Sequence, residues 1–277
     1  MMKLLAENHY YKVTEPLEKV TINTLFAQDI IQQKIKGKIY VDNIDTPNTF
    51  YIVHPYGMTL LLGAHNNESF NADFKEYSLN IGNIRNHFEW MQAYPNAWHP
   101  VLAELYKDCI IRSSDNKNQL NHGIIELNTR VNFKFNPQKY RDIKTSFPSD
   151  DVKIVRTDSV IFRNMKGSVI PHYFWKNEQD FLNNGVGFSL LYQNQPASTA
   201  YSACIQGNQL EFGIETAEDF RGKGFAEMVC LALLEYAIKN NFEPVWACKL
   251  ENKESYNLAQ KLGFEPSLEI PFYRLSN

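Results

Sequence analysis

The segment from Glu211 to Ala226 reads EFGIETAEDFRGKGFA, and it decides the fold of the region around it. An apolar stretch enters a turn that holds Gly222 and Gly224, and an apolar run of helical length follows at once. Glycines in such a turn let backbone N–H groups approach an anion, and the helix N-terminus adds a partial positive charge. The pattern predicts a phosphate cradle between a strand and a helix. The glycines alone are equally typical of a tight turn.

The sequence on both sides of this segment predicts an α/β arrangement around one sheet. Before the cradle we expect a short helix over 178–183 and strands over 187–192, 197–205 and 210–216. After it we expect a helix over 224–240, a strand over 244–250, a helix over 255–262 and a strand over 271–275.

The first half of the chain alternates short apolar runs with polar turns and carries no recognisable chemical motif. Strands are predicted over 37–42, 48–54, 57–63, 123–127 and 131–135, and a helix over 96–107. Turn formers cluster at Ser146–Asp151, where the apolar pattern stops. We therefore expect two domains, a mixed α/β domain over 1–147 and a second domain over 148–277.

Composition excludes several classes of protein. The 277 residues include 28 Lys and Arg and 31 Asp and Glu, a net charge of −3 that argues against a nucleic-acid partner. The sequence contains no apolar run of the roughly 20 residues that a membrane helix needs, and its start lacks a signal-peptide pattern. We expect a cytoplasmic protein without a membrane partner; a homodimer is left open. The cysteines and histidines lack metal-site spacing, so we expect no metal.

Two motifs in order carry a family resemblance. The pattern R-x-x-G-x-A spans Arg221–Ala226, and N-x-x-S at Asn252–Ser255 precedes K-L-G-F at Lys261–Phe264. Over about residues 150–277 the sequence resembles GNAT-superfamily N-acetyltransferases. The segments Trp175–Asn177, Gly185–Phe188 and Trp246–Cys248 resemble the branch that includes zwittermicin A resistance acetyltransferases. The resemblance implies a mixed, mostly antiparallel sheet flanked by helices. It also implies transfer of an acetyl group from acetyl-CoA to the amine of a small molecule.

The resemblance also assigns residues. Backbone amides of the cradle would bind the CoA pyrophosphate, and the strand before it would pair with the pantetheine arm. The implied cofactor-binding residues are Ile214, Thr216, Arg221, Gly222, Lys223, Gly224, Phe225, Ala226, Asn252 and Ser255. Asn252 or Ser255 would also serve as a helix cap, which is compatible with a CoA contact.

An amine acceptor is protonated at neutral pH, so its attack on a thioester needs a base. Glu211 is our first choice because several relatives carry a strand glutamate close to this position, and Glu215 is the second. Both are also typical of a solvated strand edge. Relatives often supply a tyrosine as general acid where this chain has Ala259, and the nearby Tyr256 need not reach the sulfur. The acid is therefore left unassigned.

Other readings stay open at this point. Ala259 favours a catalytically weak module that senses acyl-CoA, whereas Glu211 with an intact cradle favours an enzyme. A transferase for a larger aminoacyl donor is disfavoured by the CoA-type cradle. Relatives often carry a divergent N-terminal half, so the first half is open to being a degenerate copy of the same fold.

Overall fold

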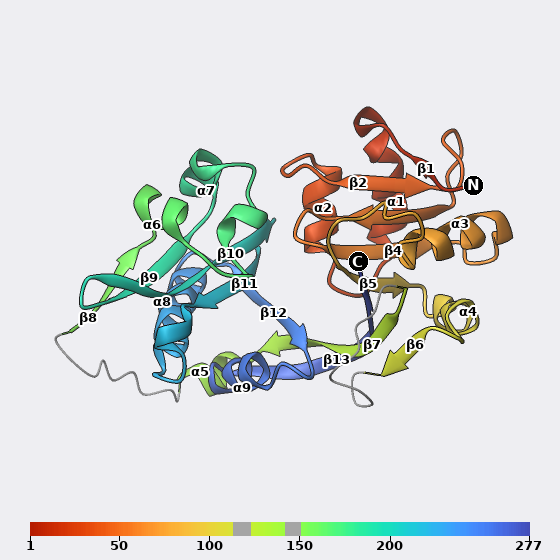
Figure 1. Cartoon of the computed structure of the whole chain (residues 1–277). Helices are drawn as coiled ribbons and strands as arrows, with labels where there is room; N and C mark the ends of the chain where they lie inside the picture. The colour runs from red at the N-terminus through yellow and green to blue at the C-terminus, as the bar shows by residue number, and fades with distance from the viewer. Residues whose placement is uncertain (113–122, 142–150) are drawn as a thin grey trace. The chain divides into compact units, whose positions relative to one another are not determined.

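The computed structural model of the chain describes residues 1–112, 123–141 and 151–277 (Figure 1). Within them, two compact units are distinguished. The first unit comprises residues 1–131, 249–251 and 269–277, and the second comprises residues 132–248 and 252–268. The boundary expected at Ser146–Asp151 falls, up to residue 150, outside the described residues. The division into 1–147 and 148–277 therefore stays a prediction.

The first unit is built on a sheet whose strands lie in sequence order. They are β1 (Lys3–Leu4), β2 (Lys38–Val41), β3 (Thr49–Val53), β4 (Met58–Gly63) and β5 (Glu89–Tyr94). Neighbours are antiparallel except β4 and β5, which are parallel. Strand β6 (Ile110–Arg112) pairs with β7 (Ile125–Phe135), and β13 (Phe264–Leu275) pairs with β5. The helices are η1 (Glu7–Val13), α1 (Thr14–Glu18), α2 (Leu25–Ile31), α3 (Glu68–Ser78) and α4 (Trp98–Leu105).

The core of the first unit lies between the sheet and helices α3 and α4. Phe74 of α3 and Trp98 of α4 are fully buried in one cluster with Leu61 of β4. The strands expected over 37–63 and the helix expected over 96–107 are confirmed as β2–β4 and α4. The two short strands expected over 123–127 and 131–135 are wrong, because they form the single strand β7. Asn128 and Arg130, which lie between the two expected strands, are polar residues buried within β7.

The second unit repeats this layout around its own sheet. Its strands are β8 (Val152–Arg156), β9 (Gly187–Tyr192), β10 (Gln195–Gln206), β11 (Gln209–Thr216) and β12 (Glu243–Lys249). Neighbours are antiparallel except β11 and β12, which are parallel. The helices are α5 (Pro137–Arg141), α6 (Ser159–Asn164), η2 (Pro171–Tyr173), α7 (Glu178–Asn184), η3 (Glu218–Phe220), α8 (Phe225–Lys239) and α9 (Lys253–Lys261). Every element expected beyond residue 178 is confirmed within about two residues, except that β13 begins at Phe264 rather than at 271.

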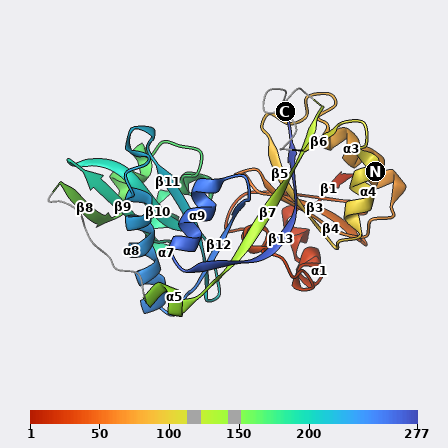
Figure 2. The ribbon, with the colours of Figure 1, turned by 90° about the horizontal axis from the view of Figure 1, so that it is seen from below.

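The two units share one order of elements. In the first it runs α1, α2, β2–β4, α3, β5, α4 and β7; in the second it runs α6, α7, β9–β11, α8, β12, α9 and β13. In both, three antiparallel strands precede a helix that leads into a parallel strand. The long strands β7 and β13 lie side by side (Figure 2), and both units take segments from each. One architecture is therefore used twice.

Candidate active site

The predicted cradle lies between β11 and α8. Gly222 and Gly224 have φ angles of +76° and +79°, which side chains other than glycine rarely adopt. A Cβ at either position would project into open space. Gly224 is the N-cap of α8, and in the described part of the chain no side chain caps this end. The first amides of a 15-residue helix thus remain available to an anion.

The basic side chains of the cradle are held by its own residues. The Arg221 Nε donates a hydrogen bond of 3.2 Å to the carbonyl oxygen of Thr216. The Lys223 Nζ lies 5.1 Å from the ring centroid of Phe220 and 5.6 Å from that of Tyr192. The hydrogen bond of Arg221 and the cation–π contacts of Lys223 hold two charged side chains on residues that directly precede or flank the glycines of the turn before α8.

Strands β11 and β12 separate next to the cradle. Their pairing runs over Gln209–Glu243, Leu210–Pro244 and Glu211–Val245, and it ends there among the described residues. Beyond this point β11 continues to Thr216 while paired with β10 on its other side. The backbone of β11 thereby presents an edge on which an extended ligand arm can add like a strand. Ile214 and Thr216 belong to this edge.

Glu211 occupies the last pair before the strands separate. Its side chain is buried, with 7% of its surface exposed. On the other side of β11 it lies opposite Cys204, next to a register shift in β10. Alternation along β11 puts Glu211, Gly213 and Glu215 on one face. The structure therefore places the first-choice base where the edge of β11 becomes free.

Glu215, the second-choice base, already has several partners. Its Oε2 accepts hydrogen bonds from the backbone N–H groups of Ser168 (2.8 Å) and Val169 (2.9 Å). Its Oε1 lies 3.5 Å from Nη2 of Arg221. These contacts hold the Glu215 carboxylate between the backbone at residues 168–169 and the Arg221 guanidinium.

Asn252 and Ser255 both lie at the start of α9. The Asn252 side chain accepts a hydrogen bond of 3.1 Å from the Ser255 N–H, so Asn252 is the cap of this helix. The Trp246 indole donates to the Ser255 hydroxyl at 3.3 Å. Ala259 is fully buried. The Tyr256 ring packs 5.4 Å from that of Phe133, so no acid is assigned.

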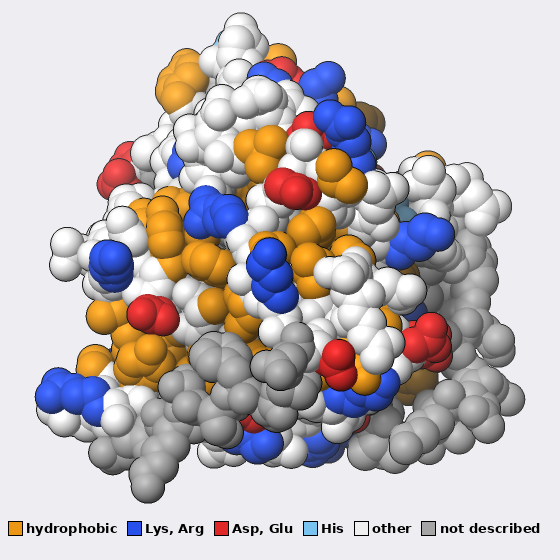
Figure 3. All heavy atoms as spheres, turned by 90° about the vertical axis from the view of Figure 1, so that its left-hand side faces the viewer, with side chains coloured by type: hydrophobic (Ala, Val, Ile, Leu, Met, Phe, Trp, Pro, Cys, Tyr) orange, Lys and Arg blue, Asp and Glu red, His pale blue; other side chains and the backbone are white. Residues whose placement is uncertain are grey.

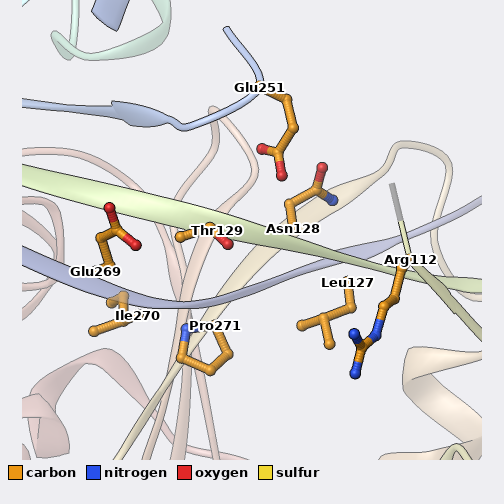
Figure 4. Close-up of a pocket in the computed structure, with 8 residues that line it drawn as sticks. All are labelled: Arg112, Leu127, Asn128, Thr129, Glu251, Glu269, Ile270 and Pro271. Carbon is orange, nitrogen blue, oxygen red and sulfur yellow. The ribbon is translucent and has the colours of Figure 1, made fainter. Parts of the chain in front are cut away.

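Sequence reasoning missed two features. One is the loop at residues 167–169, for which a lone glycine at 167 was the available signal. The other is a cavity of about 410 Å³ within the first unit, lined by residues of β7, β13 and the segment after β12 (Figure 4). Figure 4 shows Asn128 and Glu251 pointing toward one another at its rim, with Glu269 farther along. The lining also includes the Arg112 guanidinium, so both acidic and basic side chains border this cavity.

Comparison with known proteins shows which family and which structures the chain resembles. A family model described as GNAT acetyltransferase matches residues 16–273. The uncharacterized N-acetyltransferase YdfB of Bacillus subtilis is 26% identical over 250 residues, which cover 90% of this chain and 89% of that protein. A GCN5-related N-acetyltransferase-like protein from Streptococcus suis has a TM-score of 0.66 at 18% identity, covering 96% of this chain and 98% of the other. A tandem GNAT protein from the clavulanic acid biosynthesis pathway has a TM-score of 0.61 at 11% identity, covering 100% and 98%.

The family model and the N-acetyltransferase relative identify the chain as an acyltransferase. Because the family model spans most of its length, the chain belongs to the GNAT acetyltransferase family. The tandem GNAT structure aligns over both units. The hypothesis that the first half repeats the fold of the second is therefore confirmed.

The described ranges contain neither a cluster of metal ligands nor a helix that could span a membrane. Within residues 1–112, 123–141 and 151–277, no three His, Cys, Asp or Glu side chains gather as metal ligands. Over the same ranges, every helix is too short or too polar to cross a membrane.

Proposed function

We propose that the protein transfers an acetyl group from acetyl-CoA to the amine of a small molecule. The observation that carries this proposal is the combination of an uncapped glycine cradle with a strand edge freed beside it. A pyrophosphate fits the first and a pantetheine arm fits the second. The CoA-binding roles given above to Ile214, Thr216, Asn252, Ser255 and the cradle residues remain part of this proposal.

In the proposed mechanism, bound acetyl-CoA supplies an activated acyl group as a thioester. A free backbone N–H on the β11 edge would hydrogen-bond the thioester carbonyl and stabilise the charge that develops on its oxygen. Glu211 would take the proton of the amine, directly or through one water, as the N–C bond forms. The C–S bond then breaks, and the electron pair leaves with the CoA sulfur.

The leaving group needs little help from the protein. A thiol has a pKa of about 8.5, so a thiolate departs without obligatory protonation near neutral pH. Ala259 in place of a tyrosine is compatible with this chemistry. Protonation by solvent suffices in the proposed mechanism.

The same Ala259 supports the alternative of a module that binds acyl-CoA without efficient turnover. A screen of small amines with acetyl-CoA, read as release of free thiol, separates the two functions. We expect thiol release that depends on the amine. CoA binding by calorimetry without turnover on any amine would instead support the sensing module.

The acceptor is proposed to be small and cationic, and we propose neither a nucleic acid nor a membrane as partner. On the face shown in Figure 3, Lys and Arg side chains are scattered among hydrophobic and acidic ones rather than gathered in a basic stripe. Nucleic-acid sites carry such stripes. On this face the described residues form no such stripe.

A further inference from the structure

The loop between α6 and η2 is fastened to β11 by a single carboxylate. Both Ser168 and Val169 donate their backbone N–H groups to Oε2 of Glu215, and the Ser168 hydroxyl lies 3.4 Å from the same oxygen. The Glu215 residue is 9% exposed. Hydrogen bonds to a buried charged acceptor are stronger than those between neutral groups. Glu215 is therefore the main attachment of this loop to the strand.

Gly167 allows the carboxylate to come this close. Its φ of +146° lies in a region that is almost restricted to glycine. A Cβ on Gly167 would overlap the Glu215 carboxyl group. Any other residue at 167 would displace either the Glu215 carboxylate or the loop, so this contact depends on the glycine.

The second oxygen of the same carboxylate faces the cradle. Oε1 of Glu215 lies 3.5 Å from Nη2 of Arg221, whose Nε is bonded to the Thr216 carbonyl. One carboxylate thus contacts the loop at 167–169 through one oxygen and the first residue of the R-x-x-G-x-A motif through the other. A guanidinium has five donors, so Arg221 can retain this contact while it meets a phosphate.

Glu215 also lies on the same face of β11 as Glu211, four residues farther along. The loop at 167–169 therefore contacts the face of β11 that also carries Glu211. A cavity of about 270 Å³ borders the same contact and is lined by Lys166, Ser198 and Glu215, among others. A ligand on this face meets a loop whose position depends on Glu215.

We propose that Glu215 is a positioning residue that couples two parts of the site. These parts are the loop at 167–169, which would contact the amine acceptor, and the cradle at Arg221, which would contact CoA. Glu215 holds the loop at 167–169 against β11, and its contact with Arg221 stiffens when a pyrophosphate orders that side chain. The consequence is that bound CoA strengthens acceptor binding, and by reciprocity the acceptor strengthens CoA binding by the same factor. The effect of CoA on acceptor binding rests on the proposed function, whereas the contacts of Glu215 with the loop and with Arg221 do not.

The kinetic test compares Glu215→Ala, Glu215→Gln and Gly167→Ala with the wild type, using an amine found in the thiol-release screen. Loss of two charge-assisted hydrogen bonds should raise the KM for the amine about tenfold or more in Glu215→Ala, while kcat falls by less than about threefold. Gly167→Ala should behave similarly, because it displaces the loop from its other side. Glu215→Gln keeps an acceptor for the two amides and should restore much of the loss.

A matched control shows that backbone strain alone is not the cause. Gly82 of the first unit also has a positive φ, +83°, and faces open space, so Gly82→Ala strains the backbone without touching the site. Its KM for the amine should equal that of the wild type. A large fall of kcat in Glu215→Ala with an unchanged KM, together with an altered pH–rate profile, would make Glu215 a base and overturn the proposal.

Amide hydrogen exchange tests the contact without any turnover. In the wild type the amides of Ser168 and Val169 should be protected, and Glu215→Ala should speed their exchange about tenfold or more. Adding CoA should slow their exchange further in the wild type but not in Glu215→Ala. If the wild type binds CoA but acetylates nothing, the proposed function fails while this measurement still decides the coupling. Equal exchange in both proteins, or no effect of bound CoA, would overturn the coupling.

Discussion

The junction between β4 and α3 in the first unit and that between β11 and α8 in the second occupy the same place in the same architecture. In the first, Asn67 caps α3 by accepting a hydrogen bond of 3.1 Å from the Phe70 N–H, and its own amide donates to Asp42 at 3.2 Å. In the second, Gly224 stands at the cap position with a positive φ. One helix end is closed by a side chain and lies beside a carboxylate, whereas the other is open to an anion.

The parallel strand pairs beside the two junctions also differ, and again the first unit is the more closed. Strands β4 and β5 are paired at five successive positions, from Met58–Trp90 to Leu62–Tyr94. Strands β11 and β12 are paired at three, from Gln209–Glu243 to Glu211–Val245. The first unit thus keeps the fold without the two features that suit a CoA molecule. Cofactor binding depends on one turn and on where one strand pair ends, both of which can change while the core is retained.

The largest effect is expected from Glu211→Gln, which keeps the size of the base but cannot accept the proton. General-base assistance is worth about 10²–10⁴-fold, so kcat should fall by that factor while CoA affinity is unchanged. The residual rate should rise with pH as more amine is deprotonated. Steady-state kinetics measures this, with Glu18→Gln at an exposed position of α1 in the first unit as control. A loss below about tenfold would place the base elsewhere.

Gly224→Asp should close the open junction as Asn67 closes its counterpart. The new carboxylate repels a pyrophosphate and replaces it at the α8 amides. Because a hydrogen bond to a charged group is worth about 1.5–3 kcal/mol, loss of two should weaken CoA binding about 100-fold or more. Calorimetry with CoA measures the change, and Gly82→Asp, at a positive-φ glycine of the first unit, serves as control. Unchanged affinity in a folded Gly224→Asp protein would remove the basis of the proposed function.

The first unit should also lose stability at acidic pH because His54 is buried. Burial lowers the pKa of His54 to about 3, whereas in the unfolded chain it is about 6.5. Between these values the unfolded state binds the extra proton, so the free energy of unfolding falls as the pH falls, by up to about 1.4 kcal/mol per pH unit. Urea unfolding at pH 7 and pH 5.5 should show this loss in the wild type and a smaller one in His54→Gln. Equal losses would show that His54 is not responsible.

The smallest effect is expected from Asn67→Ala, which removes the cap of α3. Loss of such a cap costs about 1 kcal/mol of stability. The binding stoichiometry should stay at one CoA per chain, because β4 and β5 remain paired and leave no free edge. Calorimetry and urea unfolding measure the two quantities. A second equivalent of CoA would mean that the cap alone distinguishes the two junctions.

Much of the second unit was predictable because its signals are local. Turns and helix ends are marked by glycines whose backbone angles depend on the residue itself, here Gly222, Gly224 and Gly263. The apolar run after Gly224 marks the helix. The division of residues 123–135 into two strands was wrong, because polarity along a chain does not reveal whether a polar side chain is buried. Arg130, for example, is only 6% exposed and lies over the Phe272 ring at 5.2 Å.

The sequence by itself determined the cradle, the order of the elements and two candidate carboxylates on one strand face. It did so because positive-φ glycines, helical spacing and alternation act over a few residues. Only the tertiary structure revealed the hydrogen-bond partners of Glu215, since these are Ser168 and Val169, more than 40 residues earlier in the chain. Likewise, the point where β11 leaves β12 is set by strand register, which arises from packing between segments that are distant in the sequence.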